Sequence, residues 1–125
     1  MLLEIPNVDQ KPGEPLRRWF FSHEQDLFVW LGDDGAPVAF QLSYGKYRNV
    51  HAIRWKAGRG FTHYRVDDGE GTAVNRDAPL LMADGLFDAP GVLTRFLELS
   101  AEMPRDIAEF VAARLKEHPE HHVAR

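Results

Sequence analysis

The stretch DLFVWLGDDGAPVAFQLSY, Asp26–Tyr44, decides the fold of this 125-residue chain. Two strand-like apolar runs, residues 26–31 and 38–44, flank the segment GDDGAP. Asp and Gly favour tight turns, because Asp bonds to its own backbone and Gly accepts a positive φ. The stretch therefore predicts an antiparallel β-hairpin.

Three further runs have the same strand character. They are RRWFF at 17–21, VHAIRWK at 50–56 and FTHYRV at 61–66. The segments between the five runs are short and rich in turn residues, and tight turns cannot join parallel strands. We therefore expect a five-stranded antiparallel β-meander over residues 16–66.

After this region the spacing of the apolar residues becomes helical. Two helices are predicted within residues 89–118, with Asp88 as the N-cap of the first and Pro104 between them. Strands followed by helices indicate an α+β fold with both helices on one face of the sheet. The residues expected to face the core from the helices are Leu93, Phe96, Leu97, Ile107, Phe110, Val111 and Leu115.

Length and composition indicate one domain with its own core, since 44% of the residues are hydrophobic. Residues 1–15 are expected to form an extended lead-in, 67–88 a long loop and 119–125 a frayed tail. The absence of cysteine excludes disulfides and thiolate chemistry. The N-terminal residues lack the pattern of a signal peptide, and no apolar run is long enough to span a bilayer, so we expect a cytoplasmic protein without a membrane partner.

Alternation along the strands assigns side chains to two faces of the sheet. The expected core residues of the sheet are Phe20, Val29, Phe40, Leu42, Ile53, Trp55 and Tyr64. The first two strands are aromatic on both faces, with Trp19, Phe21, Phe28 and Trp30 on one of them. Two helices can cover only one face, so the other needs the lead-in, the 67–88 loop or a second subunit.

The segment FTHYRVDDGEG, residues 61–71, concentrates ionisable side chains. Its carboxylates do not follow the spacing of a calcium loop, and its DDG repeats the turn sequence at 33–35. We interpret Asp67, Asp68 and Glu70 as turn residues, with metal binding or acid–base chemistry as the alternative. No cofactor and no metal site is predicted.

A basic cluster on the sheet is the leading candidate site. Residues 16–66 hold eight Lys and Arg against four Asp and Glu, although the chain has a net charge of -4. A tight turn at AGRG, residues 57–60, would place Arg54 opposite His63, with Arg65 on the same face. Such a cluster would bind an anion unless Asp67 neutralises it. The candidate ligand-binding residues are Gln41, Arg54, His63, Arg65 and Trp30.

Other chemistry lacks a supporting motif. There is no nucleophile elbow, phosphate-binding loop or dinucleotide-binding fingerprint. Basic and aromatic residues do mix in the sheet, but the RNA-binding consensus is absent and the chain is acidic, so we do not expect nucleic-acid binding.

The pattern DLFVW…FQLSYGK…W…VDDGE, residues 26–70, resembles small uncharacterised bacterial proteins of about this length. The resemblance implies a single-domain protein and carries no activity, substrate or site residue. From the residues themselves we expect a non-catalytic binding or interaction module that forms a homodimer. The alternative is an enzyme or sensor for a small anionic ligand, built on the Arg and His cluster.

Overall fold

The computed structural model describes residues 1–6, 8, 10, 12–45, 50–67, 80–83 and 89–118, and within 66–67 and 80–83 only the backbone. The strands are β1 (Leu3–Ile5), β2 (Leu16–Phe21), β3 (Asp26–Leu31), β4 (Pro37–Tyr44), β5 (His51–Lys56), β6 (Gly60–Asp67) and β7 (Leu80–Ala83). The helices are α1 (Ala89–Leu99), the 3-10 turn η1 (Ser100–Glu102) and α2 (Arg105–Glu117).

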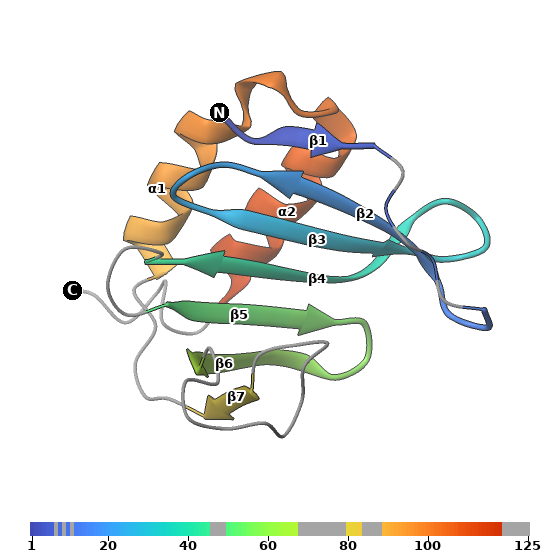
Figure 1. Cartoon of the computed structure of the whole chain (residues 1–125), viewed down its shortest axis with the longest axis horizontal. Helices are drawn as coiled ribbons and strands as arrows, with labels where there is room; N and C mark the ends of the chain where they lie inside the picture. The colour runs from blue at the N-terminus through green and yellow to red at the C-terminus, as the bar shows by residue number, and fades with distance from the viewer. Residues whose placement is uncertain are drawn as a thin grey trace.

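The strands form one antiparallel sheet in the order β1-β2-β3-β4-β5-β6-β7. Both helices lie behind the sheet in Figure 1, so the α+β class and the predicted helical layer are confirmed. The predicted number of five strands is wrong, because short strands extend both edges of the meander. β1 lies in the expected lead-in and β7 in the expected 67–88 loop.

The core lies between the helices and one face of the sheet. Phe20, Val29, Phe40, Leu42 and Ile53 are buried there, as predicted. The first residues of the chain close the layer, because Leu2 is fully buried and its N–H donates to the Leu99 carbonyl at 2.8 Å. Trp55 is only half-buried, and it packs against Phe110 of α2 with ring centroids 5.2 Å apart.

Three predictions about the helical layer have different outcomes. Leu97 was expected in the core but is 51% exposed, because the buried stripe of α1 continues to Leu99 instead. Pro104 precedes α2 as its N-cap residue, and Asp106 lies in the first turn. Asp88 and the tail from residue 119 lie outside the described residues.

The turn between β5 and β6 is one residue shorter than predicted, and this exchanges the two faces to which the side chains of β6 belong. The strands close at Lys56↔Gly60, so three residues form the loop instead of the expected four. Gly58 in the loop and Gly60 at its end adopt φ of 80° and 83°, values that glycine accepts without a steric penalty. This one-residue shift reverses every side chain of β6. Tyr64 therefore lies on the face away from the helices, and its predicted place in the core is wrong.

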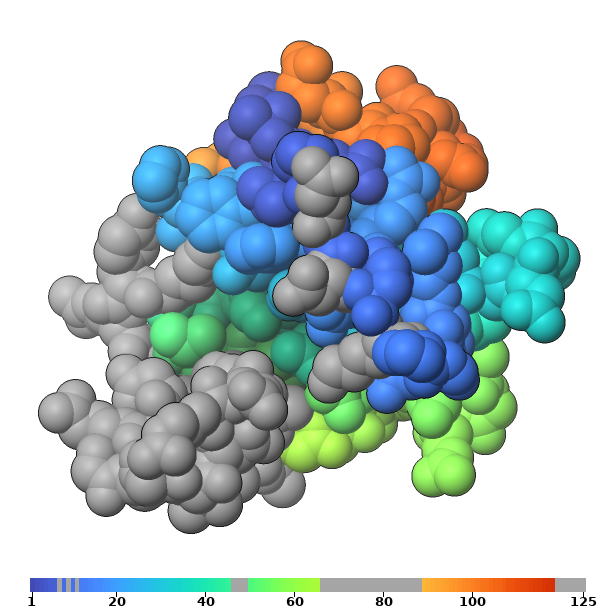
Figure 2. Space-filling view, turned by 45° about the vertical axis from the view of Figure 1, so that its right-hand side comes forward, coloured from blue at the N-terminus to red at the C-terminus, as the bar shows by residue number. Residues whose placement is uncertain are grey.

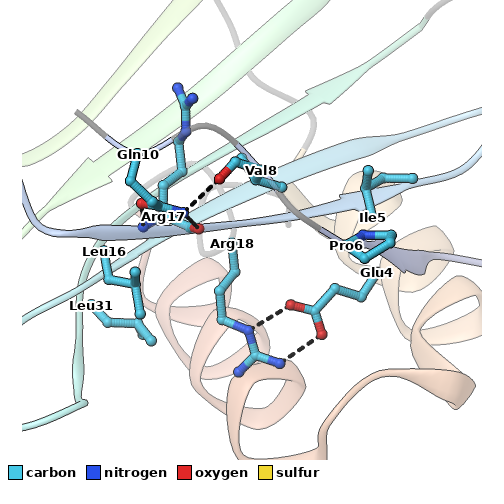
Figure 3. A pocket seen from close by; sticks show the side chains of 9 residues that line it. All are labelled: Glu4, Ile5, Pro6, Val8, Gln10, Leu16, Arg17, Arg18 and Leu31. Atoms are coloured by element: carbon cyan, nitrogen blue, oxygen red, sulfur yellow. Dashed lines mark hydrogen bonds and ion pairs between the residues drawn. The ribbon is translucent and has the colours of Figure 1, made fainter.

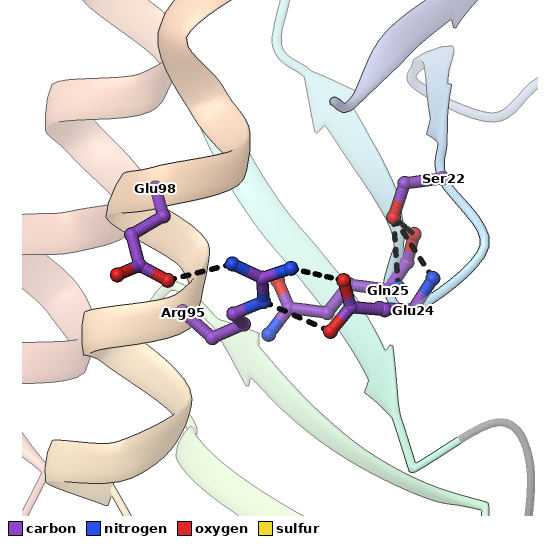
Figure 4. Close-up of polar contacts among 5 residues, drawn as sticks. All are labelled: Ser22, Glu24, Gln25, Arg95 and Glu98. Carbon is purple, nitrogen blue, oxygen red and sulfur yellow. Dashed lines mark hydrogen bonds and ion pairs between the residues drawn. The ribbon is translucent and has the colours of Figure 1, made fainter.

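Salt bridges attach the helical layer to the β2–β3 turn (Figure 4). Arg95 of α1 pairs with Glu24 of the turn and with Glu98 one turn along its own helix. The turn itself is held by Ser22, whose hydroxyl donates to the Gln25 carbonyl at 2.8 Å and accepts from the Gln25 N–H at 2.9 Å. The Arg95 side chain is 44% exposed, so we assign this cluster to surface structure.

Candidate functional site

The predicted ligand-binding residues are divided between the two faces of the sheet. Arg54 pairs with Gln41 on β4 and with Thr62 on β6, instead of His63. His63 and Arg65 pair with Ile53 and His51, and therefore lie on the side of the helices. The predicted contact between Arg54 and His63 is wrong, because the β5–β6 hairpin closes at Gly60, one residue earlier than expected.

Arg54, Gln41 and Trp30 remain together on the face that the helices leave open. The Arg54 side chain donates from Nε and Nη2 to the Gln41 Oε1 at 3.0 and 2.6 Å. On its other side the guanidinium lies over the Tyr64 ring, 5.9 Å from the centroid. Contacts on two sides fix the orientation of the cation in the middle of the sheet.

A groove of about 410 Å³ lies next to this cation. It is lined by Glu14, Pro15, Trp30, Val38, Ala39, Arg54 and Lys56. The lead-in supplies one wall: Figure 2 shows its end, in blue, standing over the open face between the β3–β4 turn, in cyan, and the β5–β6 turn, in light green. The volume falls within the range of small-molecule sites.

Glu14 offsets one of the two positive charges that line the groove, and neither cation is held in an ion pair within the described residues. In the described part of the chain, neither Arg54 nor Lys56 forms an ion pair, and the hydrogen bonds of Arg54 go to the neutral amide of Gln41. A guanidinium has five N–H donors in a planar fork, so Arg54 keeps donors beyond those that Gln41 accepts.

An aromatic stripe crosses the open face at β2 and β3. Its members are Trp19, Phe21, Phe28 and Trp30, as predicted from their alternation. Trp19 stacks on Phe28 with centroids 5.5 Å apart, and Phe28 lies 6.1 Å from Trp30. At the β1 end the stripe is accessible, since Phe21 is 36% exposed and its cross-strand partner Leu3 is 56% exposed.

A second hollow, of about 390 Å³, lies beneath the lead-in at the β1–β2 edge (Figure 3). Its polar groups bond to each other. The Gln10 side chain accepts from the Arg17 N–H and donates to the Arg17 carbonyl, both at 2.8 Å, and so occupies a sheet edge that the short β1 leaves unpaired. Arg18 holds Glu4 with two hydrogen bonds of 2.7 Å.

The pair Glu4–Arg18 changes the titration of its carboxyl group. The hydrogen bond from Arg18 lowers the pKa of Glu4 below its ordinary value of 4.5, with partial burial opposing the shift. The two side chains are 39% and 30% exposed. Because Glu4 and Arg18 of this hollow are paired with each other, we place the candidate ligand site in the groove at Arg54.

Tyr44 and His51 form a cluster with His63 that the sequence did not predict. The rings of Tyr44, His51 and His63 stack on the side of the helices, with the two imidazoles 5.3 Å apart. The Tyr44 hydroxyl and the His63 Nε2 share a hydrogen bond of 2.5 Å. The correct hairpin register would have revealed this cluster, because Tyr44 pairs with His51 and His63 is one strand further.

Within the described ranges, no three His, Asp or Glu side chains lie close enough to hold a metal ion. Neither helix in that part of the chain is long and apolar enough to cross a membrane. Asp68 and Glu70 lie outside the described residues, as does the side chain of Asp67.

No family model, no curated protein and no solved structure matches the chain. The resemblance to small bacterial proteins therefore stays a prediction.

Proposed function

We propose that this protein is a non-catalytic interaction module, and that it acts as a homodimer which pairs through the open face of its sheet. The aromatic stripe carries the proposal. Helices and core strands bury one face, whereas four large aromatic side chains occupy the other without a described helix above them.

The chemistry of the β1 end of this face suits contact with a second copy. Leu3 and Phe21, which pair across β1 and β2, are 56% and 36% exposed, and Trp19 lies between Phe21 and Phe28. Large aromatic side chains without intervening Lys or Glu are typical of the centre of a protein interface. A two-fold pairing needs only one such surface, because each copy presents the same patch to the other.

Sedimentation velocity tests this proposal. We expect wild-type protein to sediment with twice the 14.3 kDa chain mass across the micromolar range. Leu3→Glu places a charge in the patch and should yield a monomer with an unchanged circular dichroism spectrum. Leu97→Glu is the matched control, since Leu97 is 51% exposed on α1. Wild-type monomers throughout, or equal effects of the two variants, would refute the pairing.

The alternative function, recognition of a small anion, has its own supporting observation in the groove at Arg54. That site lies toward the opposite strand end from the Leu3–Phe21 pair, because Trp30 pairs with Arg17 at the far end of β2. The two functions are therefore compatible.

A further inference from the structure

We infer that the groove lined by Trp30, Arg54 and Lys56 binds a small aromatic monocarboxylate. The inference rests on the shape and charge of the groove, and it is independent of the proposed dimer. Three of its features select the ligand: the charge, the fork of Arg54 and the indole wall.

The lining residues select a single negative charge. Arg54 and Lys56 bring two positive charges and Glu14 one negative charge, which leaves one positive charge for a ligand to neutralise. A dianion such as a phosphate monoester would be left with excess charge beside Glu14. A monocarboxylate matches the net charge of the groove.

Arg54 is oriented before any ligand arrives. Its Nε and Nη2 are held by the Gln41 Oε1, and its Cζ lies 5.9 Å from the centroid of the Tyr64 ring. A cation fixed in this way loses little side-chain entropy when it binds a carboxylate through its remaining N–H groups. Lys56 is exposed and lines the same groove, where its ammonium group supplies a second donor.

The uncharged lining selects a flat ring. Trp30 offers an indole beside the cations, and Pro15, Val38 and Ala39 complete an apolar wall. Aromatic rings stack on indole in offset or edge geometries that saturated rings cannot use. The groove volume of about 410 Å³ accommodates one ring with its carboxylate, with space for substituents.

Benzoate is the probe for this site, and the indole N–H signals of the three tryptophans are the readout. In a ¹H–¹⁵N NMR titration the signal of Trp30 should move most, while that of Trp55, on the opposite face, is the internal control. Benzyl alcohol keeps the ring without the charge, and cyclohexanecarboxylate keeps the charge without the flat ring. Both should bind more weakly than benzoate, as should phenyl phosphate.

Variants separate this site from non-specific binding. Arg54→Gln should lower benzoate affinity at least about tenfold, because a charge-assisted hydrogen bond is lost. Lys56→Gln, at an exposed position, gives a second test if Arg54→Gln does not fold. Glu14→Gln should strengthen binding. Arg59→Gln removes the same charge as Arg54→Gln from an exposed turn outside the groove and should have no effect.

The titration is repeated with the Leu3→Glu protein, in which we expect the same affinity for benzoate. This comparison distinguishes a wrong proposal of the dimer from a wrong proposal of the ligand site. The inference is overturned if millimolar benzoate moves no indole signal, or if Trp55 moves as much as Trp30. Equal affinities of wild type, Arg54→Gln and Lys56→Gln would also overturn it.

Discussion

Trp19 combines two opposing contributions to stability at one residue. Its ring stacks on Phe28, but its Nε1 is buried and has no acceptor among the described residues. An unsatisfied buried donor costs about 1–3 kcal/mol. Trp19→Phe removes this donor as well as part of the ring area, so we expect a free energy of unfolding within about 1 kcal/mol of the parent protein.

Trp55→Phe is the matched comparison. Trp55 stacks on Phe40 at 6.0 Å and packs against Phe110, and removal of its ring area relieves no buried unsatisfied donor. We expect it to destabilise the protein by about 1 kcal/mol more than Trp19→Phe does. Urea unfolding in the Leu3→Glu background measures both without a contribution from dimer dissociation. A larger loss for Trp19→Phe would contradict this account of the indole.

At the scale of elements, Glu4 and Arg18 join the short edge strand β1 to β2. Because the folded-state pKa of Glu4 is lowered, its stabilisation is present above the unfolded value of 4.5 and is lost as pH falls through the folded value. Glu4→Gln should therefore reduce the free energy of unfolding at pH 7, and the difference from wild type should be smaller at pH 3.

The size of this effect is small, because Glu4 is 39% exposed and solvent screens the pair. We expect less than about 1 kcal/mol at pH 7. Urea unfolding at both pH values measures it, with Glu14→Gln as the control, since Glu14 has no ion pair in the described part of the chain. A difference that persists unchanged at pH 3 would show that Glu4 acts through packing instead.

The elements also show what the sequence could predict. The hairpin of β3 and β4 followed from its alternation and from the turn around Gly35, which adopts a φ of 83°. The register of β5 and β6 did not, because the segment AGRG fits a loop of three or of four residues, and the structure pairs Lys56 with Gly60. The edge strands β1 and β7 span three and four residues, too few for a readable pattern.

This register error explains the partial success at the candidate site. Arg54, Gln41 and Trp30 lie on strands whose faces were assigned correctly, so they stay together on the open face. His63 and Arg65 lie on β6 and moved to the other side. The lead-in was one of three expected covers for the open face, but the sequence could not show that Glu14 and Pro15 line the groove, because their position depends on how the chain crosses the sheet.

At the scale of the whole molecule, the main asymmetry is between the two faces of the sheet. One is covered by α1 and α2, and the other carries the aromatic stripe at β2 and β3 and the cationic groove at β3 to β5. The exposed apolar side chains at the β1 end of this stripe, Leu3 and Phe21, form a surface that a two-layer domain is expected to use for contact with another molecule. The proposed homodimer gives that surface a self-complementary partner.

Isotope-filtered NOE spectroscopy on an equal mixture of labelled and unlabelled protein tests this claim most directly, because it detects only contacts between copies. We predict intermolecular NOEs among the side chains of Leu3, Trp19 and Phe21, and their loss in Leu3→Glu protein. The absence of intermolecular NOEs under conditions that preserve the fold, or NOEs confined to helix residues such as Leu97, would contradict pairing through the open face.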